Sequence, residues 1–238
     1  MIRGRLSNQN GIESEVTIEC GEIVLHGTLV IPEHCTGIVL FAHGSGSGRR
    51  SPRNRSVAQV LQAQGIATLL FDLLTWAEES VDQFTAELRF DIPFLAERLI
   101  GATHWVMRRP DLQNLAIGYF GASTGAGAAL VAAAKLPTDV GAVVSRGGRP
   151  DLAGDALRSV VAPTLLIVGG NDEPVIAMNN TALAKLKCRE KMLVIIPGAT
   201  HLFEEPGTLD EVARIAAGWF TQHLTTARRD RVSASHQG

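Results

Sequence analysis

Hydrophobic residues along this chain fall into two kinds of segment that alternate through most of its length. The first kind is short and continuously apolar, which is typical of strands buried on both faces of a sheet. These runs cover residues 37–42, 66–71, 115–120, 140–145, 164–168 and 192–196. The second kind carries apolar residues at helical spacing. These segments cover residues 56–64, 93–107 (with a start as early as residue 88), 126–135, 177–186 and 209–224, and residues 151–160 form a short helix or a loop.

Two further β-rich runs, residues 15–20 and 22–31, meet at Gly21 and are expected to pair as an antiparallel hairpin. Pro32 ends the second run because proline cannot donate to a strand ladder. Strands that alternate with helices from residue 37 onward predict an α/β chain with a doubly wound, mostly parallel sheet. The acidic stretch 73–85, with an exposed Trp76, is expected to be irregular.

No repeat or linker divides the 238 residues. We therefore expect a single domain over residues 1–238, with a core at about residues 15–225. The polar first 13 residues are expected to be mobile, and residues 226–238 to form a flexible tail.

Composition narrows the function classes. The net charge is −2 and aromatics make up 5%, so nothing in the chain favours nucleic acid as a partner. Three scattered cysteines are too few for a disulfide framework or a zinc site. No signal peptide and no apolar run of membrane-spanning length occurs, so we expect a soluble, cytoplasmic protein without a membrane partner.

The stretch around Ser123 carries the strongest chemical signal. An apolar run ends in Gly121-Ala122-Ser123-Thr124-Gly125, and an alanine-rich helical segment follows. Strand, sharp turn and helix form the context of a nucleophile elbow, in which glycines let strand and helix approach closely. A glycine-rich turn with an ordinary surface serine is the alternative, because this pattern also arises by chance in a chain with 24 glycines.

A serine nucleophile needs a base and an acid that orients the base. His201 follows the last apolar run in Pro197-Gly198-Ala199-Thr200-His201 and is the predicted base. Asp172 follows an earlier run and is the predicted acid, with Asp151 as the alternative. In parallel sheets the carboxyl ends of the strands share one edge, so these residues are expected to gather in one crevice.

The tetrahedral intermediate of such a reaction needs two backbone amides as an oxyanion hole. We assign one to Thr124, directly after the nucleophile. The second is expected from the loop His43-Gly44-Ser45-Gly46-Ser47-Gly48, at Ser45, with Gly44 or Gly46 as alternatives. A phosphate-binding P-loop is excluded here because no Gly-Lys-Ser/Thr follows.

Several arginines also fall at the crevice. Arg146 and Arg149 are the candidates for substrate binding, because a guanidinium fork binds carboxylate well. Arg49, Arg50, Arg53 and Arg55 follow the glycine-rich loop. Ion pairs with Asp72, Glu78, Asp151 or Glu204 are the structural alternative for this cluster.

Taken together, the elbow, His43-Gly44, Asp172 and His201 resemble the α/β-hydrolase superfamily over about residues 15–225. The segments Ser145-Arg146-Gly147-Gly148-Arg149-Pro150 and Pro197-Gly198-Ala199-Thr200-His201-Leu202-Phe203 are similar to the dienelactone-hydrolase-like group. True dienelactone hydrolases use a cysteine nucleophile, whereas this chain has Ser123.

This resemblance implies an α/β-hydrolase fold and a carboxylesterase that forms an acyl-enzyme on a small-molecule ester, with no cofactor and no metal. Thioester or amide hydrolysis, acyl transfer and a non-enzymatic binding or regulatory module remain alternatives. The oligomeric state is open, and a homodimer is compatible with the sequence.

Overall fold

A computed structural model describes residues 11–235 of the protein. Its strands form one eight-stranded sheet in the order β1-β2-β4-β3-β5-β6-β7-β8. The strands are β1 (Ile12–Cys20), β2 (Ile23–Ile31), β3 (Gly37–Ala42), β4 (Ile66–Phe71), β5 (Ala116–Ala122), β6 (Val140–Arg146), β7 (Thr164–Gly169) and β8 (Lys191–Ile196). The pairs β1–β2 and β2–β4 are antiparallel, and all other neighbours are parallel. The predicted fold class and the N-terminal hairpin are therefore confirmed.

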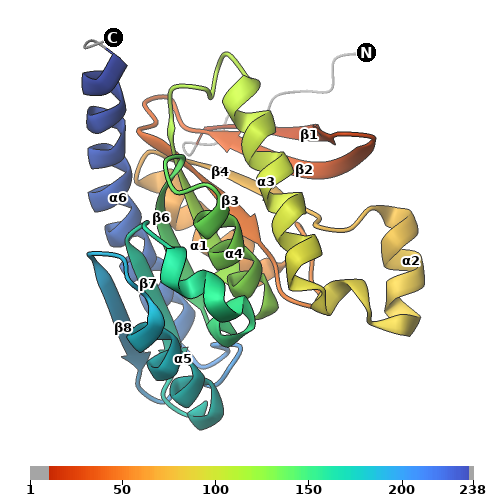
Figure 1. The fold of residues 1–238 in the computed structure, drawn as a ribbon, viewed down its shortest axis with the longest axis vertical. Helices are drawn as coiled ribbons and strands as arrows, with labels where there is room; N and C mark the ends of the chain where they lie inside the picture. Colours follow the sequence, from red (N-terminus) through yellow and green to blue (C-terminus); the bar gives the residue numbers. More distant parts are fainter. Residues whose placement is uncertain (1–10, 236–238) are drawn as a thin grey trace.

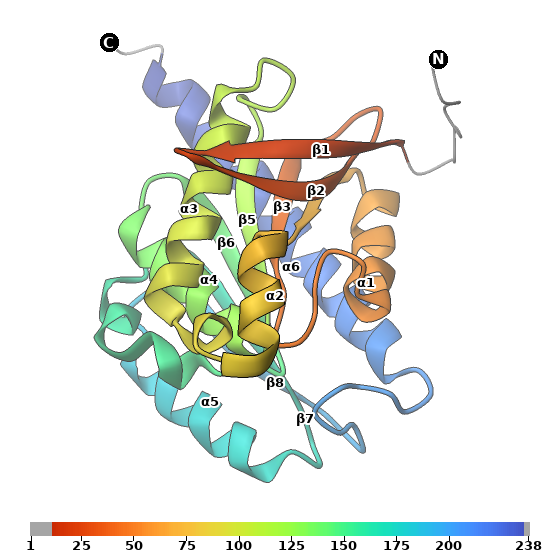
Figure 2. The same cartoon turned by 90° about the vertical axis from the view of Figure 1, so that its right-hand side faces the viewer.

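Helices cover both faces of this sheet (Figures 1 and 2). They are α1 (Pro52–Ala63), α2 (Trp76–Thr85), α3 (Ile92–Arg108), α4 (Thr124–Lys135), α5 (Glu173–Lys185) and α6 (Thr208–Ser235), with 3-10 segments η1 (Leu88–Phe90) and η2 (Pro150–Ser159). One face packs against α3 and α4, and the other against α1 and α6. The central strands β3, β4, β5 and β7 are buried along their whole length, which explains their continuously apolar sequences.

Residues 76–85 form a helix, so the prediction of an irregular segment is wrong. Thr75 accepts a hydrogen bond from the Glu78 amide at 3.2 Å, and the Glu78 carboxylate accepts one from the Thr75 amide at 2.7 Å. This capping box satisfies two amides at the helix start and stabilises α2 despite its weak apolar pattern. Trp76 is 83% exposed, as the sequence indicated. Figure 1 shows α2 at the right-hand margin, beside the main body.

The last helix is longer than predicted. The apolar pattern ends at Leu224, but α6 continues to Ser235, so most of the segment expected to be a flexible tail is helical. A helix can continue on backbone hydrogen bonds alone after its apolar face ends, and the apolar pattern does not report that continuation. At the other end, the sheet begins at Ile12, within the 13 residues expected to be mobile. Residues 1–10 and 236–238 lie outside the described part of the chain.

Candidate active site

Ser123 lies at a strained turn between β5 and α4. Its φ and ψ are 50° and −121°, a conformation that costs a non-glycine residue free energy and concentrates at functional sites. The two glycines of the motif are required by packing. A Cβ on Gly121 would lie 2.4 Å from the Ala126 Cα, and one on Gly125 would lie 2.2 Å from the Ala42 carbonyl oxygen. The local geometry is therefore the expected strand–turn–helix elbow.

Asp172 and His201 are in contact. The Nδ1 of His201 lies 2.7 Å from Oδ2 of Asp172, so the carboxylate accepts the Nδ1 proton and leaves Nε2 free for a substrate or nucleophile. The loops that carry them are joined twice: Asn171 donates from its side chain to the Gly198 carbonyl at 2.9 Å and from its backbone to the Ala199 carbonyl at 2.9 Å. The alternative acid Asp151 instead binds Arg149.

Ser123 and His201 reach the same edge of the sheet through neighbouring segments. The Ser123 amide donates to the Arg146 carbonyl at 3.3 Å. The following residue, Gly147, lies against His201, because a Cβ there would be 2.9 Å from the His201 carbonyl oxygen and 3.7 Å from its Cε1. Although the structure describes both residues, it contains no Ser123–His201 hydrogen bond. Such bonds are often long before substrate binds.

The loop after β3 packs directly on the elbow. A Cβ on Gly44 would lie 3.0 Å from the Ser123 Cβ, so glycine allows the loop to approach the nucleophile. The Ser45 amide donates to Oγ1 of Thr124 at 3.0 Å, and Thr124 is buried. The structure thus brings together Ser45 and Thr124, the two residues assigned to the oxyanion hole.

The role of His43 was missed from the sequence. Its Nε2 accepts the Leu73 amide at 3.0 Å, so Nδ1 carries the proton and donates to the Gly44 carbonyl at 3.0 Å. Burial is the main cause that lowers the pKa of His43, so the ring is neutral when it makes these bonds. His43 therefore holds the Gly44–Ser45 loop against the segment after β4.

The two arginine candidates have different surroundings. Arg149 makes a bidentate contact with Asp151 at 2.9 and 2.7 Å, which fits the structural alternative. Arg49 binds Asp72 at 3.1 Å, and Arg53 binds Glu204 at 3.3 Å. Arg146 is only 7% exposed, and its Nε and Nη1 have no hydrogen-bond partner among the described residues.

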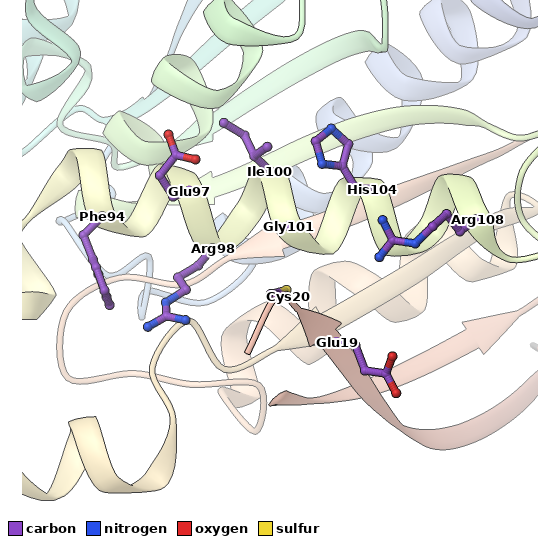
Figure 3. A pocket seen from close by; sticks show the side chains of 10 residues that line it. Glu19, Cys20, Phe94, Glu97, Arg98, Ile100, Gly101, His104 and Arg108 are labelled. Carbon is purple, nitrogen blue, oxygen red and sulfur yellow. The ribbon is translucent and has the colours of Figure 1, made fainter. Parts of the chain in front are cut away.

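One hollow lies near this edge of the sheet, and another lies away from it. One, of about 550 Å³, runs along the loop Ser45–Gly48 and the start of α1, where Arg49, Arg50 and Arg53 line it. The other, of about 390 Å³, lies between the end of β1 and α3, and Figure 3 shows Cys20 facing α3 there. Burial raises the pKa of the Cys20 thiol, so it is a poor thiolate nucleophile. This second hollow contains no candidate catalytic residue.

Within residues 11–235, no group of three or more His, Cys, Asp or Glu side chains is arranged to hold a metal ion. Nor does any helix in that range combine the length and apolarity that a membrane crossing requires.

Comparisons with known proteins agree with this geometry. Residues 27–225 match the model of the dienelactone hydrolase family. The crystal structure of a dienelactone hydrolase from Anabaena variabilis is 64% identical, with a TM-score of 0.87 over 89% of this chain and 98% of that one. The chain belongs to the dienelactone hydrolase family, and its fold is that of the α/β hydrolases.

Two further relatives, one more distant and one longer, carry less information about this chain. Est1E from Butyrivibrio proteoclasticus is 16% identical with a TM-score of 0.73, over 87% of this chain and 98% of its own, and shares the fold. A Mycobacterium tuberculosis protein named "Putative phosphoribosyl transferase" is 58% identical over 89% of this chain. That match covers 47% of the relative, so the chain spans about half the length of this curated protein.

Proposed function

We propose that this chain is a serine hydrolase that cleaves small-molecule carboxylic esters through an acyl-enzyme. The observation that carries the proposal is the 2.7 Å Asp172–His201 contact at the sheet edge where Ser123 adopts its strained turn. Membership of the dienelactone hydrolase family supports hydrolysis in general. The ester substrate and the catalytic roles of Ser123, His201 and Asp172 are what we propose.

In the proposed reaction, Ser123 Oγ attacks the ester carbonyl carbon while His201 Nε2 takes its proton. Asp172 holds the imidazole in the required tautomer and stabilises the imidazolium that forms. His201 then gives the proton to the departing alkoxide, which leaves as the alcohol. Water attacks the acyl-enzyme with His201 as base, and the carboxylic acid is released.

The negative charge on the carbonyl oxygen is stabilised by the amides of Thr124 and Ser45. In the free protein the Ser45 amide is bonded to the Thr124 hydroxyl. An oxyanion would share or replace this acceptor as it forms. Because Thr124 is buried, its amide acts in surroundings where a hydrogen bond to an anion is strong.

The mycobacterial relative is named for the whole of a protein, and the match to this chain covers 47% of that protein. Transferase chemistry therefore need not reside in the part that is similar to this chain. Thioester or amide cleavage would use the same three residues as ester cleavage, and a substrate series separates them.

The test is covalent labelling with a fluorophosphonate, followed by rates on a matched ester, thioester and anilide. We expect Ser123 to be the labelled residue and the ester to react fastest. Ser123→Ala should lose the label and about 10⁴-fold or more in kcat while keeping the melting temperature. Ser80→Ala is the matched control, because the half-buried Ser80 hydroxyl donates only to the Trp76 carbonyl within its own helix, α2. Labelling at another residue, or wild-type turnover by Ser123→Ala, would refute the proposal.

A further inference from the structure

The few large apolar side chains of α2 face away from the protein. Trp76, Ser80 and Phe84 follow one another at four-residue spacing, so they lie along one stripe of the helix. Trp76 is 83% exposed and Phe84 84% exposed, and Val81 beside this stripe is 60% exposed. Figure 2 looks onto the side of the molecule from which α2 projects. This side of α2 is therefore a cluster of large apolar groups in contact with water.

The opposite side of α2 holds the helix on the body through charged groups. Glu78 forms an ion pair with Arg98 of α3. Asp82 is fully buried, and its carboxylate accepts hydrogen bonds from the Leu88 amide at 2.6 Å and from Nε of Arg89 at 2.6 Å. A surface helix ordinarily turns its apolar side to the core and its charges to water. In α2 this arrangement is inverted, and exposed apolar groups of this kind mark interaction sites.

The stripe is complementary to itself, which points to a second copy of the chain. Two α2 helices that pack antiparallel about a two-fold axis at Ser80 bring Trp76 of each copy opposite Phe84 of the other. The small side chain of Ser80 at the axis lets the two helices approach closely. Aromatic pairs of this kind are favourable beyond the area that they bury. We propose that the outward face of α2, formed by Trp76, Ser80, Val81 and Phe84, is the contact of a homodimer.

The area of this outward face is close to what a dimer needs. An aromatic side chain carries about 150–250 Å², so the exposed parts of Trp76 and Phe84 supply about 350 Å² per copy. With Val81 and the rim of the stripe, two copies bury about 1,000 Å², which is the lower limit of a specific interface. We therefore expect a dimer that dissociates at micromolar concentration, and a monomer that is stably folded.

The charges of α2 favour a second copy over a membrane surface. Helices that lie on membranes carry Lys or Arg beside their apolar side. Residues 76–85 contain Glu78, Glu79 and Asp82 and no basic residue. The stripe itself carries no charge, so two copies meet along it without repulsion between like charges.

Sedimentation velocity from low micromolar to submillimolar concentration tests the dimer. The wild type should change from monomer to dimer over this range. Phe84→Glu should raise the dimer dissociation constant by about a hundredfold or more, because it buries a charge against Trp76 of the other copy. Val81→Glu should weaken the dimer as well. Val161→Glu is the matched control, because Val161 is also 60% exposed but lies between η2 and β7.

The substituted side chains face water in the monomer, so dilute Phe84→Glu and Val81→Glu should keep the melting temperature of the dilute wild type. If Phe84→Glu does not fold, Val81→Glu decides. A dimer that neither substitution weakens would lie elsewhere on the protein and would overturn the proposal.

A mixing experiment tests the antiparallel arrangement. Trp76→Lys and Phe84→Glu should each be mostly monomeric on their own. In an equimolar mixture the introduced ammonium and carboxylate face each other at one contact, and the native Trp–Phe pair forms at the other. The mixture should therefore dimerise more strongly than either variant alone. A mixture that associates no better than its components would overturn the antiparallel pairing.

The oligomeric state of the wild type decides between a second copy and other occupants of the outward face of α2. A chain that stays monomeric up to submillimolar concentration would overturn the proposal. Binding of that monomer to phosphatidylcholine vesicles, lost in Phe84→Glu, would then assign the face to a lipid surface instead. None of these measurements involves ester hydrolysis, so a failure of the proposed function would leave the dimer unaffected.

Discussion

The most informative single substitution in the proposed triad is Asp172→Asn. It removes one negative charge while keeping the size of the side chain. In the transition state His201 becomes an imidazolium next to this charge, with the two bonded atoms 2.7 Å apart. Two unit charges about 4 Å apart attract by about 4 kcal/mol at the effective dielectric of a partly exposed site.

A loss of this size corresponds to about a 10³-fold fall in kcat. The Asp172 side chain is 13% exposed and that of His201 38%, so solvent screens part of the interaction and the true value should not be much larger. Loss of the preferred tautomer adds to the effect, because the side-chain amide introduced by the substitution can present a donor to Nδ1. The protein should stay folded, since one partner of the pair is well hydrated.

The assay is steady-state hydrolysis of a neutral 4-nitrophenyl ester, with melting temperatures to show that each variant folds. Asp151→Asn is the matched control. Asp151 also pairs with a basic side chain, but with Arg149 rather than His201. We expect its kcat within a few fold of the wild type. A fall of less than tenfold for Asp172→Asn, or an equal fall for Asp151→Asn, would refute the assignment of the acid.

Two further predictions concern the loop that carries Ser45. Thr124→Val removes the acceptor of the Ser45 amide and should lower kcat by about tenfold with little change in KM. Thr124→Ser keeps a hydroxyl acceptor and should have the kcat of the wild type. Equal kcat in all three proteins would contradict this positioning role. Burial lowers the pKa of His43 from its ordinary value of 6.5, so the unfolded chain binds more protons below that pH. The melting temperature should therefore be highest above about pH 6.5 and fall as the pH drops, more steeply in the wild type than in His43→Asn. Burial also lowers the pKa of His223, which therefore adds the same pH dependence of stability to the wild type and to His43→Asn. Parallel curves of melting temperature against pH for the two proteins would contradict the role of His43.

Much of this architecture was predictable from local pattern. Continuous apolar runs identify buried parallel strands, because both faces of such a strand must be covered. The elbow was predictable because only glycine fits at Gly121 and Gly125. A Cβ added at either position would lie 2.4 Å or less from a neighbouring backbone atom. The α2 helix was not predictable from apolar periodicity, because its apolar pattern is weak. Its signal in the sequence is the capping pair Thr75 and Glu78.

The pairing of charged side chains was decided only by the tertiary structure. Asp172 and Asp151 both follow strands in the sequence, and only the approach of the loop after β8 brings His201 to Asp172. Arg146 and Arg149 are three residues apart in one glycine-rich segment, yet one is buried without a partner and the other is held by Asp151. Local sequence determines backbone conformation through sterics and hydrogen bonding over a few residues. The partner of a charge depends on which distant segment folds against it, and that is a property of the packed sheet.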